Sequence, residues 1–201
     1  MKTILYLAFI QLALLPSGRN LKLQSELVQM RAADQKILLD QMKANQPQAL
    51  PDTMKREYST RLWQIFRTYG YPDYDLVDTA GADAFYLLVQ HQKNDTVLQK
   101  AVLGAMREKV KQGKASPQNM AYLTDRMLYD TGHLQIYGTQ YTQDSIGTYI
   151  PLPLAYPDRV DSLRHTVGLS PIAEYIQMIN SLTIDSAGNI YYGKKKTTDQ
   201  K

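Results

Sequence analysis

Glycine and proline residues divide this chain into segments of helical length, and this division limits the folds that it can adopt. Two Ser-Pro pairs, at 116–117 and 170–171, combine a helix-capping residue with a proline suited to the first helical turn. Gly70, Gly113 and Gly132 stand where helices are expected to end. The predicted helices cover 21–44, 52–69, 80–92, 94 or 95 to 112, 117–130, 158–167 and 171–180.

The first predicted helix carries an apolar stripe with one anomaly. Its apolar residues keep mostly helical spacing: Leu23, Leu27, Met30, Ile37, Leu38 and Met42. Asp34 interrupts this stripe, so a carboxyl group is placed among residues that are expected to face the core. Asp52 is a candidate cap for the helix that follows.

The hydrophobic period changes to two after Gly132. From His133 to Tyr141, polar or aromatic residues at every second position alternate with the apolar or small residues Leu134, Ile136 and Gly138. Thr148 to Ile150 can return as a second strand, and 190–192 is a further short strand candidate. With no βαβ alternation, no GxGxxG and no P-loop, the prediction is a mainly α fold, a single helical domain with a small antiparallel β-hairpin near 133–151.

The composition excludes several kinds of site. The chain of 201 residues has no cysteine, so disulfides, thiolate metal sites and cysteine nucleophiles are excluded. Its three histidines have no i, i+4 spacing, and the aspartates of 71–79 lack the EF-hand pattern, so we expect a solvated loop there, no metal site and no cofactor. Much of the net charge of +4 comes from lysines at 194–196 and 201, which argues against nucleic acid as a partner.

The N-terminus has the pattern of a secretory signal. A lysine at position 2 precedes about a dozen apolar residues, and small residues follow Pro16. The apolar run is too short for a full membrane span of about 20 residues. We expect residues 1–19 to be a signal peptide and the mature chain to be exported, periplasmic or extracellular, without membrane attachment. An uncleaved anchor and a buried N-terminal helix are the alternatives. Residues 20–182 then form the domain, and 183–201 a partly disordered C-terminal extension.

The densest group of polar candidates lies between 121 and 140. Asp125 and Arg126 stand near the end of a predicted helix, about 100° apart, so they do not pair with each other. His91 lies on the apolar stripe of its own helix, where an imidazole can act as a general base or acid or can simply be a bonded histidine at the core edge. In the functional interpretation, Arg126 binds a carboxylate or phosphate and Asp125 orients His91.

The predicted strand contributes Gln135, Tyr137 and Gln140. Gln140 shares the side of the strand that carries Leu134 and Ile136, where an unpaired buried amide costs roughly 1–3 kcal/mol. It is therefore expected to bind either backbone groups or a ligand. Gly138 allows a second backbone or a ligand to approach closely.

The chain resembles a bacterial family of unknown function, domain family 6624. The resemblance rests on Leu-Thr-Asp-Arg at 123–126 and Gln-Ile-Tyr-Gly-Thr-Gln at 135–140, with support from 70–72, 89–91, 115–117 and 167–169. It covers about 58–179 and implies that six side chains converge: His91, Asp125, Arg126, Gln135, Tyr137 and Gln140. The family pattern often has an acidic residue two places after the histidine, where this chain has Lys93.

Three hypotheses follow from these residues. In the first, the polar cluster binds a small polar molecule or a peptide. In the second, the protein is an enzyme such as a hydrolase, with His91 as general base, Asp125 as its orienting group, and Arg126 and Tyr137 stabilising developing charge. In the third, the cluster is a buried network that holds the hairpin to the helices of a structural envelope protein.

Overall fold

Helix α3 (Tyr74–Gln90) lies at the centre of the helical part of the fold and has nine buried residues. The structure is a computed structural model that describes residues 18–44, 46, 50–93, 95–184 and 190–192. Around α3 pack four helices: α1 (Leu21–Lys43), α2 (Asp52–Tyr69), α4 (Thr96–Lys111) and α5 (Pro117–Asp130). Their apolar faces share one core, and this part of the fold is built from the helices that the sequence predicts.

The C-terminal third contains shorter elements. It consists of β1 (Tyr141–Gln143), β2 (Tyr149–Pro151), the 3₁₀ turn Pro157–Arg159, α6 (Val160–Thr166), α7 (Ile172–Asn180), β3 (Leu182–Ile184) and β4 (Ile190–Tyr192). Strands β1 and β2 form one antiparallel pair, and β3 and β4 form another. The predicted mainly α fold with a small antiparallel hairpin is confirmed.

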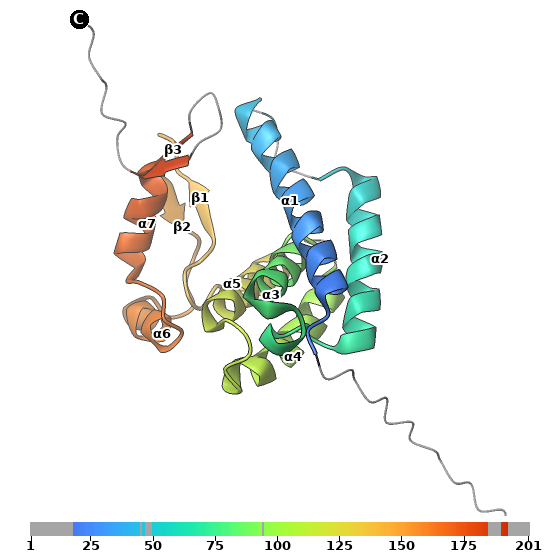
Figure 1. Ribbon diagram of the computed structural model, residues 1–201. Coiled ribbons are helices and arrows are strands. Elements are labelled where there is room, and N and C mark those ends of the chain that lie inside the picture. The colour runs from blue at the N-terminus through green and yellow to red at the C-terminus, as the bar shows by residue number, and fades with distance from the viewer. Residues whose placement is uncertain (1–17, 45, 47–49, 94, 185–189, 193–201) are drawn as a thin grey trace, which may run out of the picture.

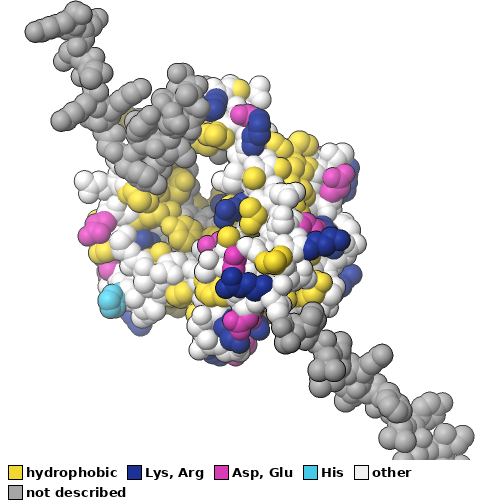
Figure 2. Space-filling model, in the orientation of Figure 1, with side chains coloured by type: hydrophobic (Ala, Val, Ile, Leu, Met, Phe, Trp, Pro, Cys, Tyr) yellow, Lys and Arg dark blue, Asp and Glu magenta, His cyan; other side chains and the backbone are white. Residues whose placement is uncertain are grey.

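The two parts lie side by side with α5 between them, as Figure 1 shows. Helix α7 packs on β2 and on α6, while α5 packs on α3 and α4. In the same orientation, Figure 2 shows the surface hollowed between the part that carries α1 and the part that carries β1 and α7. Hydrophobic side chains gather on the β1 and α7 side of this hollow.

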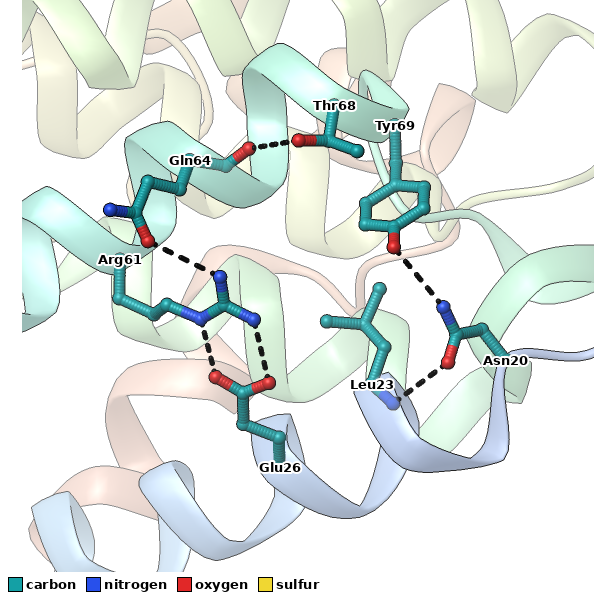
Figure 3. Close-up of polar contacts among 7 residues, drawn as sticks. All are labelled: Asn20, Leu23, Glu26, Arg61, Gln64, Thr68 and Tyr69. Atoms are coloured by element: carbon teal, nitrogen blue, oxygen red, sulfur yellow. Dashed lines mark hydrogen bonds and ion pairs between the residues drawn. The ribbon is translucent and has the colours of Figure 1, made fainter. Parts of the chain in front are cut away.

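Polar contacts hold α2 beside the N-terminal half of α1 (Figure 3). The Arg61 guanidinium binds the Glu26 carboxylate through two hydrogen bonds, of 2.5 and 2.8 Å, and these bonds lower the pKa of Glu26. Asn20 caps α1 by accepting a bond from the Leu23 amide, and its Nδ2 donates to the Tyr69 hydroxyl. These contacts fix the face of α2 that does not line the cavities described below.

The aspartates of 71–79 cap helices and form ion pairs. Asp73 accepts bonds from the amides of Asp75 and Leu76, so α3 begins at Tyr74 and not near Ala80 as predicted. The helix kinks at Asp78 (φ 55°), whose carboxylate caps the next turn at the Gly81 amide. Asp73 also pairs with a lysine of α4. Among the described residues no cluster of three or more potential metal ligands occurs.

Two predicted caps do not form. The N-cap residue of α2 is Pro51 and that of α7 is Pro171, and neither makes a side-chain cap bond. Asp52 is therefore the first helical residue of α2, where it pairs with Lys55. At α7 the first amide, that of Ile172, is bound by a carboxylate from α6. By contrast, Ser116 caps α5 as predicted.

The predicted strand from His133 is shorter than expected and begins at Tyr141. Residues 133–140 are irregular, apart from one isolated parallel bridge between Gln135 and Leu154. The backbone amides of Ile136, Tyr137 and Thr139 bind a side chain of α5 instead of a neighbouring strand, and Gly138 turns the chain at φ 68°. The positive φ favours glycine here, and a Cβ atom on Gly138 would also force the end of the Ile172 side chain of α7 to shift.

The predicted signal peptide lies almost wholly outside the described residues, as does much of the predicted C-terminal extension. Strands β3 and β4 lie at 182–184 and 190–192. In the described ranges there is no helix with the length and apolarity needed to cross a membrane.

Candidate functional site

His91 is held by a buried carboxylate from another helix. Its Nδ1 lies 2.7 Å from Oδ2 of Asp34, which is fully buried on α1. Asp34 Oδ1 has no hydrogen-bond partner in the described structure. The ring therefore has a fixed orientation, with Nε2 as the nitrogen that makes no bond to a described residue. The aspartate that interrupts the apolar stripe of α1 is thus the partner of the histidine.

Asp125 does not orient His91, in contrast to the sequence interpretation. It is fully buried, and both carboxylate oxygens face the segment after α5. They accept bonds of 2.8–3.1 Å from the amides of Ile136, Tyr137 and Thr139, and one of 2.9 Å from the Thr139 hydroxyl. Both oxygens of this carboxylate are therefore occupied by hydrogen bonds within the fold. The role of Asp125 is to hold the 136–139 turn.

Gln135 and Gln140 close the same turn from its other side. The Gln135 amide donates to the carbonyls of Gln140 and Leu152 and accepts from the Gln140 amide nitrogen. The Gln140 side chain donates to the Thr139 hydroxyl at 3.1 Å. Gln135 therefore binds backbone only. Gln140 is bonded as well, yet it also lines a cavity.

Tyr137 lines neither cavity and is joined to the turn through its backbone. Its amide donates to Asp125, and its carbonyl accepts a 2.7 Å bond from Arg164. Burial raises the pKa of the Tyr137 hydroxyl, and the nearby Asp125 charge raises it further. The hydroxyl is therefore neutral at neutral pH.

Arg164 is a structural residue that sequence reasoning missed. Only 1% of it is exposed, and its guanidinium binds the carbonyls of Tyr137 and Ser170 while lying 4.9 Å from the Tyr175 ring centroid. Burial lowers its pKa. Its position four residues after Val160 and three before Val167, both buried, was the available signal in the sequence.

The first cavity, here called the basic cavity, has a volume of about 730 Å³. It lies between α2 and the residues that join α3 to α4, with Arg126 of α5 at one side. Four lysine and arginine side chains line it, against two aspartates. The lining residues include Asp52, Lys55, Arg56, Ser59, His91, Gln92, Lys93, Asp95 and Arg126.

Both aspartates of the basic cavity are already engaged. Asp52 pairs with Lys55 at 3.0 Å. Asp95 accepts bonds from the Ser59 hydroxyl and the Trp63 indole, and it caps α4. Three of the cations have no hydrogen bond or ion pair within the described structure: Arg56, Lys93 and Arg126. The cavity therefore has unbalanced positive charge.

Two buried donors at this cavity lack partners. Gln92 is 4% exposed, and its Nε2 is bonded to no described atom. The Nε of Arg126 is likewise buried without a partner. Leaving such donors unsatisfied costs roughly 1–3 kcal/mol each. Neither atom is exposed to the cavity, so a ligand reaches them only when these side chains shift.

The second cavity, here called the tyrosine cavity, has a volume of about 460 Å³. Five tyrosines and two glutamines line it, and Lys93 and Arg126 belong to the lining of both cavities. The aromatic and amide residues are Tyr86, Gln90, Tyr122, Tyr129, Gln140, Tyr141 and Tyr175.

The six predicted residues are thus divided between two roles. His91 and Arg126 line the basic cavity, and Arg126 and Gln140 line the tyrosine cavity. Asp125, Gln135 and Tyr137 build the turn beside it. The residues that prediction missed around the cavities include Asp34, Gln92 and Lys93. In the sequence, Asp34 differs from its neighbours only as a charged residue within an apolar stripe.

These features define the class of protein as a helical domain with two polar cavities that adjoin at one arginine and one lysine. The chain belongs to the family of unknown function DUF6624, whose model matches residues 21–185. The match includes every residue that lines either cavity. No curated protein and no solved structure matches the chain.

We expect Asp125→Ala to lower the free energy of unfolding by about 3–5 kcal/mol, because three amides and a hydroxyl lose a buried acceptor. Chemical denaturation of the two proteins measures the difference. Asp158→Ala, at an exposed aspartate, serves as the control and should change stability by less than about 0.5 kcal/mol. Equal stability of Asp125→Ala and the wild type would show that the carboxylate does not hold the turn.

Proposed function

We propose that this protein binds a small anionic ligand, a carboxylate or a phosphate, in the basic cavity. The observation that carries the proposal is Arg126, a half-buried cation that makes no ion pair within the described structure and lines a cavity large enough for a small molecule. Guanidinium groups bind carboxylates and phosphates through pairs of hydrogen bonds, which suits a site for such an anion.

The neighbours of Arg126 support the same ligand chemistry. Lys93 and Arg56 add positive charge to the same lining, which also includes Gln92. Asp130 lies close enough for Arg126 and Lys93 to lower its pKa, but burial outweighs them and the pKa is raised overall. It forms no ion pair with either cation, so both remain available for an external anion.

We predict that Arg126→Gln weakens the binding of inorganic phosphate or succinate by about 10- to 100-fold, the equivalent of one or two lost charge-assisted bonds. Isothermal titration calorimetry of the wild type and the variant measures the two dissociation constants. Arg107→Gln is the matched control, because Arg107 is exposed on α4 and lines neither cavity.

The control variant should bind as the wild type does. The proposal fails if the wild type binds neither anion, or if Arg126→Gln and Arg107→Gln bind them with equal affinity. A uniform loss in both variants would indicate a long-range effect of net charge and would also count against a specific role of Arg126.

A second candidate function is acid–base catalysis at His91. The observation that favours it is the Asp34 carboxylate at Nδ1, since a buried carboxylate fixes the ring and its tautomer and leaves Nε2 to exchange a proton. No serine or threonine oxygen is hydrogen-bonded to His91 in the described structure, so a hydrolytic reaction here would use water as nucleophile.

If His91 is a general base, the double variant His91→Gln, Asp34→Asn should lose about 10²- to 10⁴-fold in the turnover of a 4-nitrophenyl ester or phosphate. The second substitution avoids leaving a buried carboxylate without its partner, which would itself destabilise the fold. His165→Gln, at an exposed histidine of α6, is the control. Absence of turnover above buffer in the wild type, or unchanged turnover in the double variant, rules against this candidate.

A further inference from the structure

We infer that the tyrosine cavity is the second compartment of the same binding groove and accepts a ring attached to the anion. The ligand class is therefore a small phosphate or carboxylate that carries a ring, aromatic or sugar, and not an isolated anion. This inference rests on the proposed function, because Arg126 is taken to hold the anionic group. It adds the part of the ligand that lies beyond the basic cavity.

The two cavities adjoin at residues that bear positive charge. Arg126 and Lys93 line both, so an anion bound between them has the basic cavity on one side and the tyrosines on the other. On α5, Arg126 lies between Tyr122 and Tyr129 at spacings of four and three residues, which places all three on one face of the helix. The helix itself therefore presents a cation flanked by aromatic rings.

Two of the tyrosines that line the tyrosine cavity have hydroxyl groups that are engaged within the fold. The hydroxyl of Tyr86 donates to Gln90 at 2.9 Å, and that of Tyr175 donates to the Thr139 carbonyl at 3.2 Å. These two tyrosines are buried, and they form a fixed wall whose polar groups are already bonded. A ligand there would meet these rings together with polar side chains, among them Gln90, Gln140 and Arg126.

Two tyrosines of the lining keep exposed area for stacking. Tyr129 is 50% exposed and Tyr141 is 44% exposed. Tyr141 is held edge to face against Tyr149, with 5.2 Å between the ring centroids. A large aromatic side chain that is half exposed and held in place beside a cavity is suited to stack on the ring of a ligand.

Charge also favours an anion that extends into this cavity. No acidic side chain is among the described residues that line it. Burial raises the pKa values of Tyr86, Tyr141 and Tyr175, so these hydroxyls stay neutral at neutral pH and do not repel a phosphate or carboxylate. Arg126 and Lys93 are the charged side chains of the lining, and both are positive.

The inference is tested by titrating the full chain with inorganic phosphate, phenyl phosphate and glucose 6-phosphate under the same conditions. At least one ring-bearing phosphate should bind about 10-fold more tightly than inorganic phosphate, which corresponds to one stacked ring. The compound that shows the preference identifies the ring as aromatic or as a sugar.

Single substitutions test whether the preference for a ring-bearing phosphate arises in the tyrosine cavity. Removal of a stacking ring, by Tyr129→Ala or by Tyr141→Ala, should abolish the preference for the ring-bearing phosphate and leave the affinity for inorganic phosphate unchanged. Tyr156→Ala is the matched control, because Tyr156 is 52% exposed but lines neither cavity. Equal affinity of the wild type for all three phosphates overturns the inference, and so does a preference that survives both Tyr129→Ala and Tyr141→Ala. In either case measurable binding of inorganic phosphate leaves the proposed function intact, whereas binding of none of the three phosphates, and of succinate neither, contradicts both.

Discussion

The carboxylate of Asp125 is the interaction on which the C-terminal third of the structure depends. It binds the amides of Ile136, Tyr137 and Thr139 from a fully buried position in the C-terminal half of α5. Because the amides of the turn point toward Asp125, the backbone carbonyls of the turn point away from it. Arg164 donates hydrogen bonds to two of these carbonyls, those of Tyr137 and Gly138. The segment 136–139 is thus fixed between an acidic group of α5 and a basic group of α6. This arrangement joins the small C-terminal elements to the helical core.

The same arrangement builds one wall of the candidate groove. Thr139 and Gln140 follow the turn directly and line the tyrosine cavity, as does Tyr175, whose hydroxyl binds the Thr139 carbonyl. The polar residues of this region therefore have two different kinds of role. Asp125 and Gln135 have their hydrogen bonds satisfied within the fold. Arg126 makes no ion pair within the described structure and lines both cavities, so its positive charge is left for a ligand.

Most of the fold could be predicted from the sequence because helix boundaries depend on local chemistry. Ser116, which precedes a proline, marks the start of α5, and Gly113, which follows an apolar stripe, lies just beyond the end of α4. Both signals come from residues at the helix ends themselves. The turn at 133–140 could not be predicted in this way. Its alternating residues are typical of a strand, but its amides bind Asp125, which is more than ten residues earlier in the chain. A side chain that replaces a strand partner leaves no periodic signal in the sequence.

The candidate site shows the same limit. Its residues were recognised by type, but their partners come from distant helices. His91, the residue that directly follows α3, pairs with Asp34 of α1, at a separation of 57 residues, and not with Asp125. Asp34 was visible as a carboxyl group in an apolar stripe, yet only the packing of α1 on α3 brings it to His91. A charged residue within an apolar helix stripe therefore indicates a partner from a distant part of the chain, although the sequence does not say which residue that partner is.

The most direct test of this account is amide hydrogen exchange, measured by NMR, at Ile136, Tyr137 and Thr139. If Asp125 organises the turn, these amides are protected in the wild type although they belong to no helix or strand. In Asp125→Asn, where one acceptor oxygen is replaced by a donor, their protection should fall, while the amides of Leu88 and Val89 in α3 keep theirs. Rapid exchange at these three positions in the wild type, or undiminished protection in the variant, would contradict the central role assigned to Asp125.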